Sequence, residues 1–233
     1  MKLHLLPDRT DSAAANMAAD FLLLQRYPLP AVRFRHYGWH RPAFTFGYSQ
    51  KIAFVRDRLP PGEPVELCRR PTGGGLVDHR EDWTYALVIP RGHPAEELRA
   101  TESYRLVHEA LAAALRRQGV AAALQPAETE DTAASGVCFQ RAEPHDVIHR
   151  ETGAKIAGAA QKRNKRGLLF QGSLWRPAVR AAVDWARFQD DLAETLAAAL
   201  KAEAAPQPWP EWAEHEFEGL TEQYASPEWI EAR

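Results

Sequence analysis

Cysteine is scarce in this chain of 233 residues, which contains only Cys68 and Cys138. Two cysteines are too few for a disulfide scaffold, so the class of small bridge-stabilised secreted proteins is excluded. Long apolar runs are also missing, because none approaches the ~20 residues that a membrane-spanning helix needs. The N-terminal apolar stretch ends at Pro7, too early for a secretory signal. We therefore expect a cytoplasmic protein without a membrane partner.

A strong charge of either sign is absent as well. The 29 Lys and Arg residues nearly balance 31 Asp and Glu, which gives a formal net charge of -2. General nucleic-acid binders are usually basic, so we expect no nucleic-acid partner. No cluster of His, Cys, Asp and Glu has the spacing of zinc ligands, and we expect no bound metal.

Apolar residues make up 45% of the chain, enough for a sizeable core. There is no internal repeat or linker-like segment, so we expect residues 1–233 to form one domain. The last stretch, residues 201–233, is too aromatic to be disordered and is expected to pack back on that domain.

Periodicity in the sequence predicts an α+β fold. Apolar spacing indicates three helices, at residues 11–27 with Asp11 as the cap, 101–118 and 183–202. Alternation indicates a half-exposed strand at 32–36, with Arg33 and Arg35 on its outer side. Further strands are expected at 43–47, 65–68, 83–89, 146–149, 154–160 and 167–175, of which 83–89 is the central one and the last three form an antiparallel meander. Because a strict βαβ rhythm is missing, we expect a sheet with helices on one side.

A glycine-rich segment supplies the first candidate site. Arg69 and Arg70 precede Thr72 and three consecutive glycines, Gly73, Gly74 and Gly75. Such glycines let a backbone approach a ligand closely and point N–H groups at it, and the arginines could pair with a carboxylate or phosphate. The alternative is a flexible hairpin turn with both arginines in water.

Lys155 supplies the second candidate, because it stands in an otherwise small and apolar strand. A lysine without its usual water could donate to an acyl oxygen or a phosphate, and the small residues Ala157 to Ala160 would leave room for an acyl chain. The alternative is an edge-strand lysine that prevents aggregation.

Three other residues could take part in the chemistry. Cys138 lies in a polar loop, where a thiol is accessible and could be a nucleophile, although free cysteines often act as small hydrophobes. Asp146 could orient a lysine amine or accept its proton, or could simply begin a strand. His79 could be an acid–base group or a loop histidine. Cys68 lies within a strand pattern and is expected in the core.

Six segments, in this order along the chain, resemble the superfamily of lipoate–protein ligases and octanoyltransferases, which includes the catalytic domain of biotin protein ligases. Residues 69–79 are similar to its Arg-Arg-x-Ser/Thr-Gly-Gly-Gly-x-Val-x-His signature, and residues 155–161 to its Lys-Ile-Ser/Ala-Gly-x-Ala-Gln segment. The other matching segments are residues 16–20, 46–50, 84–86 and 169–174. The resemblance runs from about residue 10 to residue 200.

The resemblance implies a mixed, largely antiparallel sheet packed by helices, with an acyl chain held in a tunnel. It implies that Lys155 contacts the acyl carbonyl oxygen or an adenylate phosphate. It also implies a set of substrate-binding residues, namely Arg70, Thr72, Gly73, Gly74, Gly75, His79, Tyr85, Asp146, Gly158, Ala160 and Gly172.

Within this superfamily two chemistries are possible for the chain. In one, octanoyl passes from an acyl carrier protein to Cys138 and then to a lysine of a lipoyl domain or a glycine-cleavage H-type protein, without a cofactor. Cys138-Phe139 resembles the Cys-Phe of that branch, and thiolate attack on a thioester is close to thermoneutral. In the other, an ATP-dependent ligase uses ATP and Mg²⁺ to form a lipoyl-adenylate; such ligases often bear an extra C-terminal domain, for which this chain ends too early.

The chain also departs from the family pattern. His79 is followed by residues 80–83, Arg-Glu-Asp-Trp, where many members have Asp and Gly, and Gln171 replaces a frequent histidine. These departures motivate a third hypothesis, a non-catalytic subunit that binds acyl groups for a separate enzyme.

Overall fold

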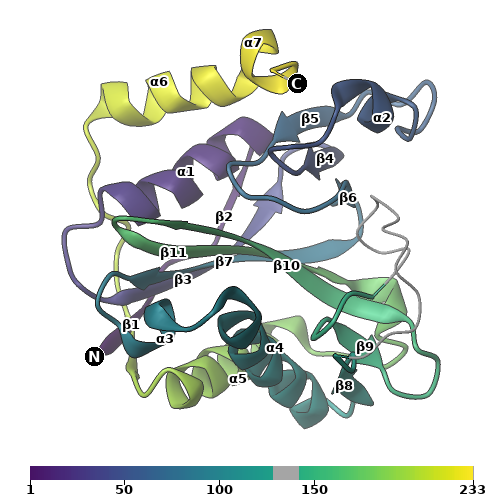
Figure 1. Ribbon diagram of the computed structural model, residues 1–233, viewed down its shortest axis with the longest axis vertical. Helices are drawn as coiled ribbons and strands as arrows, with labels where there is room; N and C mark the ends of the chain where they lie inside the picture. The colour runs from purple at the N-terminus through teal and green to yellow at the C-terminus, as the bar shows by residue number, and fades with distance from the viewer. Residues whose placement is uncertain (128–141, 233) are drawn as a thin grey trace.

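The computed structural model describes residues 1–127 and 142–232 (Figure 1). Its helices are α1 (Ala13–Gln25), α2 (Ile52–Arg56), α3 (Pro94–Glu97), α4 (Ala100–Arg117), the 3₁₀ turn Arg176–Ala178, α5 (Trp185–Ala199), α6 (Glu214–Ala225) and α7 (Pro227–Ile230). Its strands are β1 (Lys2–Leu5), β2 (Arg9–Asp11), β3 (Val32–Trp39), β4 (Ala43–Phe46), β5 (Glu66–Arg69), β6 (Val77–Asp78), β7 (Asp82–Pro90), β8 (Ala122–Leu124), β9 (Val147–His149), β10 (Lys155–Asn164), β11 (Gly167–Trp175) and β12 (Glu203–Pro206).

Nine strands of the described residues form one mixed sheet. Its order is β12-β1-β3-β7-β11-β10-β9-β8, with β2 also paired to β3. Every neighbouring pair from β3 to β8 is antiparallel, whereas β1 lies parallel to both β3 and β12. This arrangement confirms the expected α+β fold and the antiparallel meander at residues 146–175.

Helices cover both faces of the sheet, so the expectation of helices on one side was wrong. Figure 1 shows α3, α4 and α5 below the sheet and α1 and α6 above it. Along the central strand β7, Trp83 and Leu87 join the core formed with α4 and α5, whereas Ala86 and Val88 pack with Leu23 of α1. A strand buried on both faces has a continuous apolar sequence, which explains the run at residues 83–89.

Strand β3 is buried on both sides, contrary to the half-exposed strand that its alternation suggested. The side chain of Arg35 has no solvent exposure and pairs with Asp20 of α1, with 2.6 Å between guanidinium and carboxylate. Asn16 also accepts from this guanidinium. The alternation of charge was therefore real, but helix α1 supplies polar partners where solvent was expected.

The starts of two predicted helices also differ from the structure. Helix α1 begins two residues later than predicted, because the hydroxyl of Ser12 rather than Asp11 accepts from the N–H of Ala15 and caps it. Helix α5 begins at Trp185, where Asp184 accepts from two backbone N–H groups. Among the described residues, no helix is long and apolar enough to span a membrane.

A small second sheet carries the glycine-rich segment. Its order is β5-β4-β6, and residues 70–76 connect β5 to β6. The C-terminal helices are attached to its base: Arg69 donates to the carbonyls of Trp229 and Ile230, and the indole of Trp229 donates back to Arg69. Tyr224 of α6 packs with Met17 of α1 in a buried cluster.

Candidate active site

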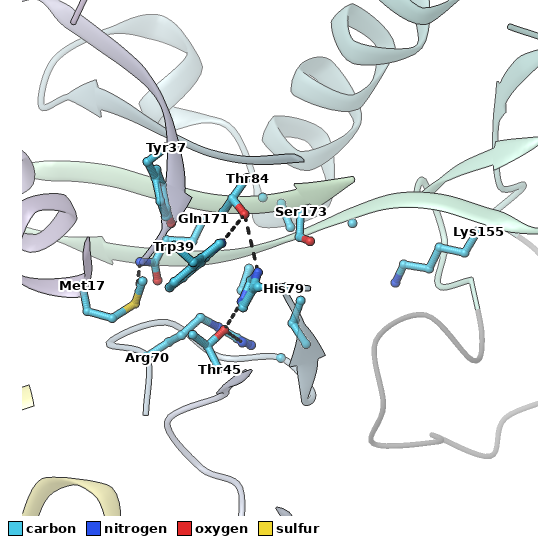
Figure 2. Close-up of a pocket in the computed structure, with 16 residues that line it drawn as sticks. Met17, Tyr37, Trp39, Thr45, Arg70, His79, Thr84, Lys155, Gln171 and Ser173 are labelled. Atoms are coloured by element: carbon cyan, nitrogen blue, oxygen red, sulfur yellow. Dashed lines mark hydrogen bonds between the residues drawn. The ribbon is translucent and has the colours of Figure 1, made fainter. Parts of the chain in front are cut away.

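A cavity lies between the main sheet, helix α1 and the glycine-rich loop (Figure 2). Lys155 lies at one end of the view and Met17 at the other, with Trp39 and His79 between them. The lining residues are Met17, Tyr37, Trp39, Thr45, Arg70, Gly74, Val77, His79, Thr84, Lys155, Gly158, Ala159, Ala160, Gln171, Gly172 and Ser173.

Lys155 is an interior residue of the sheet, so the edge-strand alternative is wrong. Its strand β10 lies between β9 and β11, and its side chain is only 6% exposed. The ammonium nitrogen lies 2.7 Å from Oδ2 of Asp146, whose side chain is also buried. A buried cation is tolerated where such a partner compensates it, and it places positive charge beside the small residues of the cavity wall.

Asp146 is held by more than the lysine. Its Oδ2 also accepts from the N–H of Glu143 at 2.7 Å, and its Oδ1 accepts from the hydroxyl of Tyr104 at 2.5 Å. Tyr104 lies in the helix predicted at residues 101–118 and was not among the candidate site residues. A buried tyrosine usually finds a hydrogen-bond partner, and that is the one sequence signal that could have brought it into the site.

Gly158 makes room for this ion pair. A Cβ at this position would lie 2.8 Å from Cε and 2.9 Å from Nζ of Lys155, and 3.0 Å from Oδ1 of Asp146. The glycine of the Lys-Ile-Ala-Gly segment is therefore explained by space for the ion pair.

The substitution Gly158→Ala is expected to destabilise the protein by about 1–3 kcal/mol, because the added methyl group forces a buried ion pair to move. Urea unfolding monitored by tryptophan fluorescence measures this change. Gly219→Ala in helix α6 is the matched control, since a Cβ there meets nothing within 4 Å. That control should be neutral or slightly stabilising. Equal midpoints for Gly158→Ala and the wild type would contradict the packing argument.

The glycine-rich loop is organised around Arg70. Its guanidinium donates to Oγ1 of Thr45 at 2.8 Å and to the carbonyls of Gly73 and Gly75 at 2.9 and 2.8 Å. Gly74 has φ of +87°, which favours glycine, and lies beside that guanidinium. The arginine thus shapes the loop from inside, where the sequence had suggested a partner for a ligand anion.

His79 is part of a buried polar network. Nδ1 of His79 lies 2.7 Å from Oδ2 of Asp82 and Nε2 lies 2.7 Å from Oγ1 of Thr45. Because a carboxylate only accepts, Nδ1 donates, and the same oxygen of Asp82 accepts from the hydroxyls of Thr84 and Ser173. Asp82, one of the departures from the family pattern, is therefore the anchor of His79.

Gln171, the other departure, fastens three elements together. Its carbonyl oxygen accepts from the hydroxyl of Thr72 at 2.8 Å, and its amide donates to Asp20 at 2.7 Å. The same amide contacts the sulfur of Met17 at 3.2 Å. The carboxamide thus links the glycine-rich loop to helix α1 across strand β11.

The structure brings most of the predicted site residues together. The cavity is lined by Arg70, Gly74, His79, Lys155, Gly158, Ala160 and Gly172. Gly73 and Gly75 accept from Arg70, and Asp146 pairs with Lys155. Thr72 donates to Gln171, which also lines the cavity. Cys138 lies outside the described residues.

Tyr85 and Gly172, both predicted to bind substrate, pack against each other. Tyr85 belongs to the core on the α4 and α5 face, and its ring lies where a Cβ of Gly172 would be, at 2.2 Å. Gly172 is therefore needed for the packing of Tyr85.

Cys68 is buried as expected, and burial raises the pKa of its thiol to about 12, so it stays protonated near neutral pH. Among the described residues, no group of three His, Cys, Asp or Glu could hold a metal ion.

Sequence comparison decides the family. Residues 12–185 match the family model of the lipoyl protein ligase A/B catalytic domain. The chain belongs to this family. The resemblance inferred from the six segments is thereby confirmed, and so is the family fold.

Among the curated relatives in the lipoyl protein ligase A/B family are proteins named Octanoyltransferase LipM. The protein from Geobacillus kaustophilus is 35% identical over 173 residues, which cover 69% of this chain and 60% of that protein. The one from Bacillus subtilis is 32% identical over 175 residues, 70% of this chain and 61% of that protein. The match thus spans about 60% of the length of these relatives.

Solved structures of the family share the fold. A putative lipoate protein ligase from T. acidophilum has a TM-score of 0.77 at 22% identity, with all of both chains covered. A lipoate-protein ligase A bound with ATP has a TM-score of 0.75 at 20% identity, with 99% of both chains covered.

Proposed function

We propose that this protein transfers an octanoyl group from an acyl carrier protein to a specific lysine of a lipoyl domain or an H-type carrier, in the cytoplasm and without a cofactor. The observation that carries the proposal is the buried ammonium of Lys155, 2.7 Å from Asp146, at one end of a cavity walled by small residues. The name of the LipM relatives supports the same reaction.

In the first step, the thiolate of Cys138 attacks the carbonyl carbon of the octanoyl thioester. A new carbon–sulfur bond forms, the carrier's carbon–sulfur bond breaks, and the carrier thiolate leaves and takes up a proton. That proton is the one that the Cys138 thiol released when it became a thiolate. Lys155 stabilises the negative charge that develops on the carbonyl oxygen.

In the second step, the amine of the acceptor lysine attacks the Cys138 thioester. An amide bond forms, and the Cys138 thiolate leaves and takes up the proton that the amine loses. In this proposal Asp146, whose Oδ2 lies 2.7 Å from the ammonium of Lys155, lies near this amine. The octanoyl chain lies along the cavity between Lys155 and Met17.

The arginines of the loop favour this reaction over one that uses ATP. Arg69 donates to the carbonyls of Tyr48, Gln50, Trp229 and Ile230, and Arg70 donates to Thr45 and two glycine carbonyls. Both guanidinium groups are therefore engaged by the protein itself, although the sequence had offered them as phosphate ligands. Octanoyl transfer from a thioester requires no phosphate contact.

The residues after 200 belong, in this proposal, to the same catalytic domain. Helices α6 and α7 pack on α1 and on strand β5, and Arg69 joins them to the glycine-rich loop. The loop that borders the cavity thus depends on the C-terminal segment.

The proposal is tested by incubating the purified chain with octanoyl-acyl carrier protein and an apo lipoyl domain, without ATP. Intact mass is expected to show an octanoyl group on the lipoyl domain. If the domain is modified only when free lipoate, ATP and Mg²⁺ are supplied, the protein is a ligase and the proposal is wrong. If the chain acylates nothing under either condition, it is an accessory binding subunit.

A further inference from the structure

Tyr104 occupies a position that neither the family pattern nor the proposed reaction explains. It comes from helix α4, and its hydroxyl lies 3.0 Å from the backbone nitrogen of Ala159 and 2.5 Å from Oδ1 of Asp146. Ala159 lines the cavity and Asp146 holds Lys155. The hydroxyl of Tyr104 thus links the cavity wall at Ala159 to Asp146, the carboxylate that pairs with Lys155.

The pairing of the strands explains why a side chain is needed here. Within the described residues, β9 pairs with β10 only at Ile148–Lys155 and Val147–Ala157. Ala159 lies beyond the last of these pairs, so its N–H has no strand to donate to on that side. A buried N–H without an acceptor is costly, and the hydroxyl of Tyr104 accepts from it.

The direction of both hydrogen bonds follows from this. A backbone N–H can only donate, so the oxygen of Tyr104 accepts from Ala159 and its single hydrogen is directed to Asp146. Burial, followed by the charge of Asp146, raises the pKa of Tyr104 well above its usual value. The phenol therefore keeps its proton and remains a donor near neutral pH.

The two oxygens of Asp146 have different partners as a result. Oδ2 accepts from Lys155 and from the N–H of Glu143, whereas Oδ1 accepts from Tyr104. Without the phenol the carboxylate could rotate about its χ2 bond and share either oxygen with the ammonium. The phenol therefore fixes the carboxylate, and the carboxylate fixes Nζ of Lys155.

His108 supports this arrangement from one turn further along α4. Its ring centroid lies 4.0 Å from that of Tyr104, and its Nδ1 lies 2.8 Å from the carbonyl oxygen of His145, the residue before Asp146. Because that carbonyl only accepts, Nδ1 donates. Burial lowers the pKa of His108 to about 4, so the ring is neutral at working pH and adds no charge beside the ion pair.

We propose that Tyr104, backed by His108, is a positioning residue that orients Asp146 and, through it, the ammonium of Lys155 toward the acyl carbonyl. This inference rests on the proposed octanoyl transfer. Tyr104 is not among the residues that line the cavity, so its phenol should affect the rate of transfer and leave the binding of the acyl chain nearly unchanged.

Tyr104→Phe tests the inference, because it removes only the hydroxyl. The kcat for octanoyl transfer is expected to fall about 10- to 100-fold, while the KM for the octanoyl donor changes less than about threefold, since a small misplacement of a catalytic group is costly. The matched control is Tyr27→Phe, which removes a phenol that is hydrogen-bonded to His4 at 2.7 Å and lies outside the cavity lining. Its kcat should equal that of the wild type.

A merely structural role would give a different pattern. In that case Tyr104→Phe would lower the melting temperature of the protein. Its kcat would return to the wild-type value when measured about 20 °C below the variant's own melting temperature, where the unfolded fraction is negligible. That result, or an unchanged kcat, overturns the inference. If Tyr104→Phe does not fold, His108→Phe retains a ring against Tyr104 but loses the bond to His145. A lower kcat is then expected, and a wild-type kcat overturns the inference.

The wild-type assay separates the two proposals. If the wild type transfers octanoyl and Tyr104→Phe does so equally well, only the role of Tyr104 is wrong. If the wild type transfers no octanoyl group, the proposed function is wrong and the role of Tyr104 falls with it.

Discussion

The Cys138→Ala variant is expected to lose octanoyl transfer by about 10³-fold or more, because a covalent route has no substitute for its nucleophile. In the wild type, incubation with octanoyl-acyl carrier protein should add one octanoyl group to the chain, and hydroxylamine should remove it. The variant should show neither the added mass nor the subsequent transfer. Intact mass spectrometry with and without hydroxylamine measures both.

Cys68→Ala is the matched control for this prediction. The side chain of Cys68 is buried among residues of α1 and α6, and burial raises the pKa of its thiol to about 12. A protonated, inaccessible thiol is not a nucleophile, so this variant should acylate at the wild-type rate although it loses some packing. If Cys138→Ala turns over normally, or if Cys68 carries the octanoyl group, the covalent route through Cys138 is wrong.

The sequence predicts the elements of this fold well where one pattern dominates. Helix α4 and strand β7 were predicted to within two residues, since the apolar stripe of the helix and the continuous apolar run of the strand have few alternatives. The prediction was wrong at β3, because its alternating arginines suggested that one face of the strand is exposed to solvent. Periodicity reports which residues share a face, but it does not report that a polar residue such as Asp20 covers it.

The site could be predicted in outline for a similar reason. Lys155 and the three glycines stand out as local anomalies, and the cavity contains the lysine and Gly74. Asp146 was a candidate as well, but its contact with Tyr104 was not predictable, because the two residues are 42 positions apart and meet only through the packing of α4 on the sheet. Asp82 and Gln171 appeared in the sequence as departures from a family pattern, and only the structure shows that they anchor His79 and Thr72.

The arginines show a further limit of arguments from residue type. Two guanidinium groups beside consecutive glycines suggest an anion site, yet both give hydrogen bonds to protein carbonyls. The carbonyl groups of a loop need hydrogen-bond donors, as ligand anions do. The sequence does not show whether an arginine donates to the loop or to a ligand. The structure assigns Arg69 to the C-terminal helices and Arg70 to the shape of the loop.

Lys155→Met is expected to have the second large effect, on activity and stability together. Loss of a cation that stabilises the developing oxyanion should lower kcat by about 10²- to 10³-fold. The variant also leaves the carboxylate of Asp146 buried without its cation, which should cost about 3–5 kcal/mol of unfolding free energy. Single-turnover transfer and urea unfolding measure the two effects. Lys162→Met, on the same strand but outside the cavity lining, should change neither rate nor stability appreciably.

The two effects of Lys155→Met can be separated with a second substitution. Asp146→Asn removes the unpaired charge while an amide oxygen can still accept from Tyr104, so the double variant should regain most of the lost stability. Its transfer rate should stay low, because no ammonium faces the acyl carbonyl. A double variant that regains activity along with stability would show that Lys155 serves the fold alone. Continued loss of transfer in a stable protein would instead tie the rate to the charged Lys155–Asp146 pair and not to the fold, since packing and net charge at the pair would then have been restored without it.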